Sequence, residues 1–466
     1  MARFGKLWKL CPQISLWPCR ETVVSCLPYR ADHSRFLHRT AFSPSSLHTL
    51  ALIHGNSLRE LRVYELEPFP TTSTVLPTGL TTFQCHSVGD GKAAAQLVHA
   101  NQKSLERLRL GQEKELVEAY KRTRIGYLEQ VPSGADILHE SIRLGELPAL
   151  LELDLCGIDL SALVPKTGEE GHDFCRLQRL SIESCPASVL FLEAIAAAFY
   201  DAQNPGDPSR IRADPRLKEF LLRSETPTTA LKETLVRFLA SFRGLETLSL
   251  LLENAALLDG PSTMIAEHGP TLRTLVMESR IQPRESLTHD TSRPFGVGAP
   301  SEELWEQSIN DICQLCPNLE ELGTGFPWGI ETVRLRRTKL PSLKNLKTIH
   351  IRNFPSSQVL LQLGDYTIKE HATKFIEWVV SPTKGGNKPS LETLAIGPTL
   401  YESRWRSSNT RRQPPEYLKT HYFWLDFGQT RFGRWSPMVS AVSDTCMAEM
   451  RGDKLSKGVF EQIWLR

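Results

Sequence analysis

One pattern of apolar residues recurs eleven times along this chain: a leucine, two variable residues, an apolar residue, one variable residue and a further residue that is usually apolar. The first leucines of the copies are Leu58, Leu80, Leu105, Leu150, Leu177, Leu217, Leu245, Leu272, Leu319, Leu346 and Leu391. Six of the ten gaps between them span 22 to 28 residues, and the others, of 40 to 47 residues, are nearly doubled or carry insertions. One phase kept over eleven copies indicates a tandem array of one structural unit.

The spacing within each copy predicts a short strand. Its last two apolar residues are two apart, so in an extended chain they point to one side, while the residues between them point to solvent. Such a strand buries its apolar side only when similar strands stack beside it, and the chain returns between strands through a helix. Apolar residues at three- and four-residue spacing predict these helices at residues 91–102, 229–242, 261–269, 301–317 and 367–380. The predicted fold class is an α/β solenoid.

The junction from helix to strand also repeats. His54, His99 and His268 each precede a Gly, Asn or Pro and then a strand, and the variant at Leu315 is Leu-Cys-Pro-Asn-Leu. We expect the three histidines to share one structural position and to cap or pack the helix end. Stacked units would separate them, which argues against a shared metal ion.

These strands, their spacing and the Cys316-Pro317-Asn318-Leu319 helix stop resemble the leucine-rich repeat superfamily over about residues 47–400. The nearest class is that of the intracellular, cysteine-containing F-box proteins and their fungal relatives. The resemblance implies a curved solenoid with parallel strands on the concave face and helices on the convex face. It also implies a substrate receptor of a cullin-type ubiquitin ligase, in which an F-box binds the ligase adaptor and the repeats hold the substrate.

Residues 1–46 contain no Leu-Pro-x-Glu-type helical opening, so an F-box is not evident. The stretch GKLWKLCPQISL at residues 5–16 instead resembles a repeat's helix end. We therefore expect residues 1–46 to form an irregular amino-terminal segment or partial repeat, and residues 47–400 to form the solenoid with loop insertions.

Residues 401–466 leave the repeat phase and become aromatic and basic. Residues 401–435 hold seven Arg or Lys against three acidic residues, together with nine Trp, Tyr or Phe. Large aromatic residues can cover the open core of a last repeat, so we expect a carboxyl-terminal cap. The alternative is a nucleic-acid-binding segment at 401–435, in which aromatic rings stack on bases and arginines contact phosphates.

Charge and cysteine usage indicate where such a chain works. Lys plus Arg is 55 against 53 Asp plus Glu, so no global field marks a nucleic-acid or membrane-surface binder. The ten cysteines are scattered and too sparse for a disulfide framework, which favours the cytoplasm or nucleus. No apolar run approaches the length of a transmembrane helix, so we expect no membrane association.

Motifs for chemistry are missing or incomplete. Cys313 and Cys316 lack a second pair at zinc spacing and are expected to lie in the core. Gly323-x-Gly325 fails as a dinucleotide fingerprint because the next glycine, Gly329, comes one place too late. The sequence thus predicts a non-catalytic protein without catalytic residues, cofactor or metal.

The strand residues that alternate with the leucines form the expected binding surface. Arg and Tyr are the usual anchors of protein interfaces, and a rigid extended concavity suits a protein partner. We expect partner binding on the concave face through Arg62, Tyr64, Arg107, Arg109, Asp154, Glu183, Arg223, His350 and Arg352. A cullin-ligase adaptor is a further expected partner.

Overall fold

The structure is a computed structural model of the 466-residue chain. It describes residues 22–26, 43–54, 57–66, 75–88, 91–111, 147–164, 174–203, 214–224, 228–253, 262–280, 302–327, 337–352, 367–379, 388–397, 420–443 and 446–447. The chain divides into two compact units, Met1–Leu217 and Lys218–Arg466. Each unit combines helices with a mostly parallel sheet and is therefore an α/β structure.

Among the described residues of the first unit, the strands hydrogen-bond to one another in chain order. They are β1 (Thr22–Cys26), β2 (Leu58–Glu65), β3 (Thr82–Ser87), β4 (Arg107–Gly111), β5 (Glu152–Cys156) and β6 (Arg179–Glu183). Every neighbouring pair is parallel. The repeated apolar residues lie on one side of these strands and are buried, as Leu108 and Leu110 of β4 illustrate. This confirms the predicted phase.

Helices connect these strands: α2 (Pro44–His54), α3 (Gly91–Ala100), α6 (Ser188–Gln203) and the short 3-10 helices η3 (Leu160–Leu163) and η4 (Phe174–Arg176). Helix α3 buries three consecutive alanines together with Leu97 and Val98, because small side chains let it lie close to its neighbours. Helix α6 is anchored by Phe191, whose ring meets that of Phe174 edge-on with centroids 6.0 Å apart.

The second unit begins with strands β7 (Glu219–Ser224), β8 (Thr247–Glu253), β9 (Thr274–Arg280), β10 (Glu321–Thr324), β11 (Thr348–Ile351) and β12 (Thr393–Ile396), which pair in parallel. Two antiparallel strands follow, β13 (His421–Gln429) on β12 and β14 (Trp435–Val442) on β13. The parallel repeat therefore ends in a β-hairpin.

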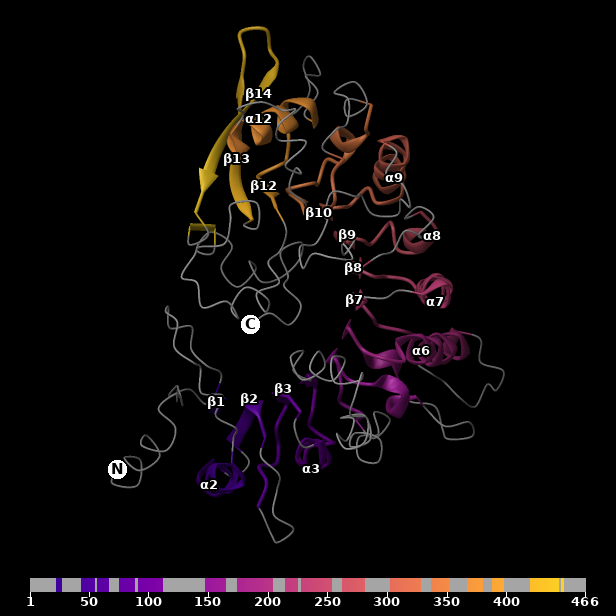
Figure 1. Ribbon diagram of the computed structural model, residues 1–466, viewed down its shortest axis with the longest axis vertical. Helices are drawn as coiled ribbons and strands as arrows, with labels where there is room; N and C mark the ends of the chain where they lie inside the picture. The colour runs from indigo at the N-terminus through magenta and orange to yellow at the C-terminus, as the bar shows by residue number, and fades with distance from the viewer. Residues whose placement is uncertain are drawn as a thin grey trace, which may run out of the picture. The chain divides into compact units, whose positions relative to one another are not determined.

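The helices of the second unit are α7 (Thr229–Ala240), α8 (Ser262–Ile265), α9 (Glu302–Leu315) and α12 (Ile368–Val379), with the 3-10 turn η5 (Leu340–Ser342). Helices α7, α8 and α9 lie together on one side of β7–β10 (Figure 1). Local caps fix where helices start. At α12, the Glu370 N–H donates to Thr367 Oγ1 at 3.3 Å while the Thr367 N–H donates to Glu370 Oε2 at 2.6 Å, a complete capping box.

A buried polar side chain joins successive repeats at the helix-to-strand turn. In the first unit Asn101 Oδ1 accepts the N–H of Leu80 at 2.8 Å. In the second unit His268 Nδ1 accepts the N–H of Leu245 at 3.4 Å. Both residues stand four places before the first leucine of their own copy. The prediction that the three histidines share one position is therefore wrong for His99, which is exposed on α3; Asn101 occupies the equivalent place.

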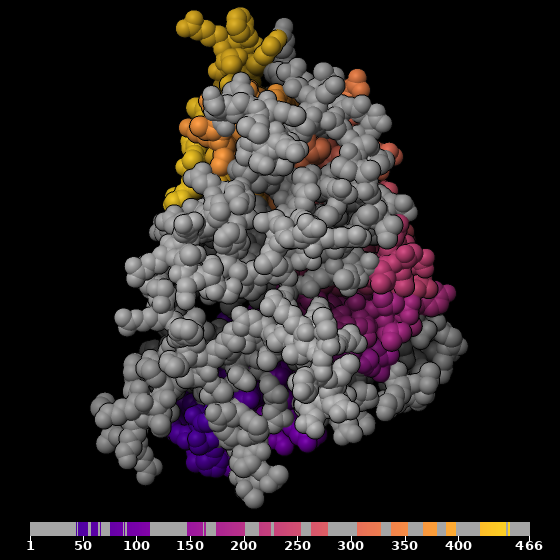
Figure 2. Space-filling model, viewed as in Figure 1, coloured from indigo at the N-terminus to yellow at the C-terminus, as the bar shows by residue number. Residues whose placement is uncertain are grey.

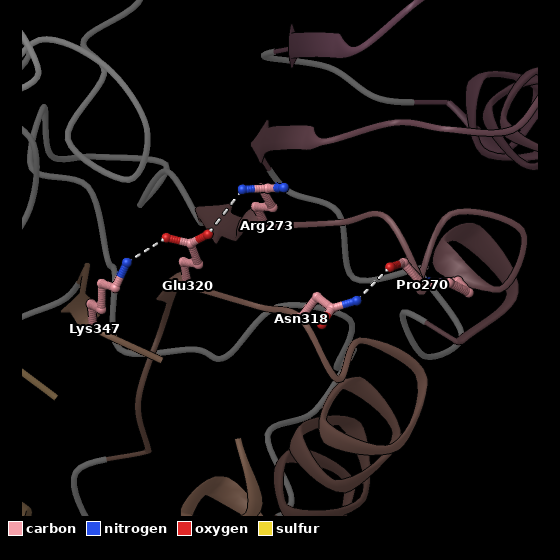
Figure 3. Close-up of polar contacts among 5 residues, drawn as sticks. All are labelled: Pro270, Arg273, Asn318, Glu320 and Lys347. Carbon is pink, nitrogen blue, oxygen red and sulfur yellow. Dashed lines mark hydrogen bonds and ion pairs between the residues drawn. The ribbon is translucent and has the colours of Figure 1, made fainter. Parts of the chain in front are cut away.

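The residue just before the first leucine forms a second link between copies. The Ser104 hydroxyl donates to the Leu80 carbonyl at 2.8 Å, and the Thr271 hydroxyl donates to the Leu245 carbonyl at 2.8 Å. At the next copy the Asn318 amide donates to the Pro270 carbonyl at 2.8 Å (Figure 3). These bonds satisfy backbone carbonyls that the strand ladder leaves without partners.

Charged residues just after the first leucines form a ladder across β9, β10 and β11. Glu320 accepts from Arg273 Nη1 at 3.3 Å and from Lys347 Nζ at 2.9 Å, so one carboxylate joins three copies (Figure 3). These contacts, chiefly the hydrogen bond from Lys347, lower the pKa of Glu320. Exposed pairs of this kind contribute about 0.2–1 kcal/mol each, so the ladder favours the register more than it stabilises the fold.

The strand predictions hold throughout: each of the eleven copies forms one strand, from β2 to β12. All five predicted helices are present, although α8 is reduced to four residues. Strand β1 and helix α6 were not predicted, and of helix α2 only the end at His54 was predicted. Residues 189–200 of α6 are apolar almost all round, so they lack the contrast that marks an amphipathic helix. The amino-terminal segment 1–46 holds β1 and the first residues of α2, whereas the stretch 5–16 lies outside the described residues.

Candidate protein-interaction face

The strand residues that alternate with the buried leucines form a charged surface on the first unit. Strand register places Arg62, Gln84, Arg109, Asp154 and Ser181 side by side on β2–β6. A second row beside it contains Glu60, Thr82, Arg107, Glu152 and Arg179. These two rows, together with His86, are called the charged strand face below. Parallel pairing brings residues far apart in sequence to one surface because each copy repeats the same phase.

Ion pairs cross this face from strand to strand. Arg107 Nε lies 3.1 Å from Glu152 Oε1, and these side chains are 58% and 37% exposed. Arg179 Nε lies 3.3 Å from Asp154 Oδ1 in a less exposed setting. On β2, Arg62 donates to Glu60. The acidic residues of β5 are thus matched by arginines on both neighbouring strands.

The part of the face on β2–β4 carries positive charge. His86 of β3 lies near Arg62 of β2 and Arg109 of β4, and its pKa is lowered to about 4, first by burial and then by the charges of Arg109 and Arg62. Its imidazole is therefore neutral at physiological pH. Guanidinium groups held on rigid strands suit the recognition of carboxylates, which they can bind through paired hydrogen bonds.

The structure brings together four predicted site residues of the first unit: Arg62, Arg107, Arg109 and Asp154. Tyr64 belongs to β2, but its side chain lies outside the described part of the structure. His86 was not predicted, although its position two residues after Gln84 places it on the side of the strand opposite Phe83 and Cys85.

Glu183 was expected to face solvent, and this is wrong because its side chain is buried at the end of β6. The chain turns directly after it, at Ser184 with φ 51°. The Glu183 carbonyl accepts the N–H of Gly157 at 2.8 Å and the thiol of Cys185 at 3.3 Å, so the turn encloses the strand end.

Three predicted residues of the second unit are also buried: Arg223, His350 and Arg352. The expectation that they are exposed is wrong. The reason is the composition of the surrounding strand face, where buried apolar residues stand between the polar ones: Leu221, Leu251, Val276 and Ala395. Exposing such a face would cost about 25 cal/mol per Å² of apolar surface, so burial is favoured.

The buried polar groups have specific surroundings. His350 Nε2 lies 2.9 Å from the Gly397 carbonyl oxygen, within hydrogen-bonding distance. A Cβ at Gly323 would lie 3.3 Å from Arg352 Cδ and 3.2 Å from Val276 Cγ2. Glycine at this place therefore makes room for the arginine stem. On the charged strand face of the first unit Thr82 and Ser181 are buried, but the side chains of Arg62 and Arg107 are 42% and 58% exposed, so this face is the candidate site that stays partly accessible.

Cys313 and Cys316, the pair at Cys-x-x-Cys spacing, lie in the second unit. Burial raises the pKa of both Cys313 and Cys316 to about 12, so both thiols are protonated and both lie in the core as predicted. No cluster of three or more His, Cys, Asp or Glu able to hold a metal ion occurs within the described ranges. In the same part of the chain no helix has the length and apolar character needed to span a bilayer.

Neither a comparison with models of known protein families nor a search among curated protein sequences finds a match for this chain.

Proposed function

We propose that this chain is a leucine-rich-repeat solenoid that recognises a protein partner and performs no catalysis. The repeat assignment is supported by the same leucine pattern in every strand from β2 to β12, and by the α-helices or 3-10 helices that follow most of these strands in the described residues. In such a solenoid the strands line the concave face and the helices the convex face. A repeat array offers a wide rigid surface, which suits binding to a protein better than to a small molecule.

The observation that carries the recognition proposal is the group of Arg62 and Arg109, in one row of the charged strand face, and Arg107 in the adjacent row. These guanidinium groups come from β2 and β4, the two strands that flank β3, and Arg107 is largely exposed. Arginine is enriched among the residues that dominate binding energy at protein interfaces. The partner is therefore expected to present carboxylates to β2–β4.

A more specific proposal is that the chain serves as a substrate receptor of a cullin-type ubiquitin ligase, with the charged strand face holding the substrate. It rests on the resemblance of the repeats to those of F-box proteins. The location proposed for this role is the cytoplasm or nucleus. In support of a reducing compartment, the seven cysteines whose side chains the structure describes are free thiols.

The test uses the full chain with Arg62, Arg107 and Arg109 all changed to Glu, and a control in which the exposed Arg243 of the second unit is changed to Glu. Both are compared with the wild-type chain by quantitative mass spectrometry of proteins that co-purify from a native extract. We expect a set of partners that the triple variant loses and the control keeps, because reversed charges repel carboxylates.

The receptor role would be supported if cullin adaptor and ligase subunits co-purify with the wild-type chain and with both variants. Equal partner sets for the triple variant and the wild type would refute recognition through this face. RNA that co-purifies and survives nuclease controls would instead favour the alternative, nucleic-acid binding through residues 401–435.

A further inference from the structure

The hairpin β13–β14 ends the sheet of the second unit and extends past its neighbour. Only the first part of β13, from His421 to Trp424, pairs with β12, whereas β13 and β14 pair with each other from Tyr422–Val442 to Gln429–Trp435. In the outer part of the hairpin, β13 thus pairs with β14 alone among the described strands. Its yellow end projects from the surface in Figure 2.

The turn at the end of the hairpin is well defined. The Thr430 N–H donates to the Arg434 carbonyl at 2.7 Å, and the Arg434 N–H donates to Thr430 Oγ1 at 3.1 Å. Gly433 closes the turn with φ 71°, a conformation that favours glycine. Two residues between these anchors, Arg431 and Phe432, are left to face solvent.

The inner face of the hairpin holds it in place. Phe423, Leu425 and Phe427 alternate along β13 and are buried. Helix α12 lies against the same hairpin (Figure 1). The base of the hairpin is therefore held by packing, so a partner that binds the tip loses little free energy to ordering this segment.

The outer face and the tip of the hairpin expose large apolar side chains to solvent. Phe432 is 83% exposed, Met438 is 52% exposed and Trp424 is 36% exposed. Arg431 and Arg434 stand on either side of Phe432 in the sequence, and no acidic partner for either lies among the described residues. The one described acid of the hairpin, Asp426, is already paired with Lys388 Nζ at 2.9 Å.

We propose that the hairpin tip, Arg431 to Arg434, is a docking element for an acidic segment of a partner protein that also carries an apolar side chain. The apolar side chain would pack on Phe432, and carboxylates would pair with the two guanidinium groups. Charge complementarity of this kind steers association, and an exposed aromatic beside arginine is the residue combination that dominates protein interfaces.

A protein segment fits this surface better than a single nucleic-acid strand. A nucleic-acid strand is bound along a groove by a series of stacked aromatic rings and a track of positive charge. In the described part of the hairpin, Phe423 and Phe427 are buried, so their rings cannot stack on bases. The positive charge is confined to the tip.

The test measures fluorescence anisotropy of a labelled peptide of about twelve residues, with Asp and Glu alternating with Leu and Trp, mixed with the full chain. Phe432→Ala and the double variant Arg431→Glu/Arg434→Glu are each expected to weaken binding at least about tenfold, and added salt to weaken it in the wild type. The control Lys339→Glu/Lys344→Glu makes the same charge change at exposed lysines of the same unit and should leave affinity within about twofold. Circular dichroism checks that all variants fold alike.

The proposal is overturned if the acidic peptide fails to bind, if a peptide with Lys in place of the acids binds equally, or if Phe432→Ala has no effect. Binding of labelled oligothymidylate that the tip variants abolish would overturn it in favour of a nucleic-acid site. The result is independent of the charged strand face, because changing Arg62, Arg107 and Arg109 to Glu should leave peptide binding intact.

Discussion

The buried side chain of His268 is expected to make the stability of the folded chain depend on pH. Its Nδ1 accepts the N–H of Leu245, and its Nε2 lies 2.8 Å from the Leu239 carbonyl oxygen, to which it donates. Both ring nitrogens are thus used by the neutral form. Protonation would break the bond to Leu245 and place a charge in the core. Burial lowers the pKa of His268 to about 4, although the bond to Leu239 and the charge of Glu267 act in the opposite direction.

The sign of the effect follows from this lowered pKa. The unfolded chain takes up a proton near pH 6.5, whereas the folded chain does so only near pH 4, so stability is complete above the unfolded pKa and falls as the pH drops between the two values. Linkage over this range predicts a loss of about 2 kcal/mol between about pH 7 and about pH 5 from His268 alone.

Two substitutions at His268 separate hydrogen bonding from titration. Asn is the equivalent residue in the first unit, at Asn101, so His268→Asn should keep an acceptor for the Leu245 N–H. His268→Ala leaves two buried backbone groups, the Leu245 N–H and the Leu239 carbonyl, without this partner. It should lower the free energy of unfolding by about 1–3 kcal/mol more than a replacement that keeps these hydrogen bonds. Both variants should lose the part of the pH dependence due to His268.

Urea unfolding followed by circular dichroism at about pH 7 and about pH 5 gives the required free energies. The stability gap between the wild type and His268→Asn should narrow by about 2 kcal/mol at the lower pH. A gap that stays constant with pH would show that this histidine does not titrate as argued. Equal stability of the Asn and Ala variants at neutral pH would refute the role of the hydrogen bond to Leu245.

Two further substitutions test the packing of the second unit by thermal unfolding. Leu248→Asp would place an unpaired carboxylate at a fully buried strand position and should lower the free energy of unfolding by about 3–5 kcal/mol. Thr247→Asp, on the opposite side of β8, should change it little. Equal effects of the two substitutions would contradict the strand phase. A Cβ at Gly269 would lie 2.2 Å from the Leu315 carbonyl oxygen at the end of α9, so Gly269→Ala should cost about 1–3 kcal/mol. Gly428→Ala, whose Cβ would meet no atom closer than 3.9 Å, is its control and should change stability little; similar losses for both glycines would refute the close approach.

The two strand faces of this protein differ in what they offer a partner. In the first unit the face carries Arg107 paired with Glu152 in an exposed position. In the second unit Leu221, Val276 and Ala395 occupy that side of the strands and are buried. In the second unit the hairpin tip instead combines an exposed aromatic side chain, Phe432, with the exposed Arg431 and Arg434.

The sequence by itself determined the repeated strand and its phase. Leucines at fixed spacing can be buried together only if every copy forms the same short strand, so local pattern and packing agree, as they do at Leu108 and Leu110. The helices at 229–240 and 302–315 followed in the same way from their apolar spacing. The prediction for the helix-to-strand junction was wrong at His99. Asn101 and His268 are chemically different residues, and their equivalence is seen only in the hydrogen bonds that both make.

Only the tertiary structure decided which polar strand residues meet solvent. The two-residue repeat of a strand shows which side each residue faces, but it does not show whether that side is covered by other parts of the protein. Arg62 and His350 have the same place in their copies, yet the first is partly exposed and the second is buried beside Gly397. The difference comes from neighbours contributed by other strands, such as Val276 and Ala395. Burial depends on the summed apolar surface of residues far apart in the chain, which no single copy of the repeat contains.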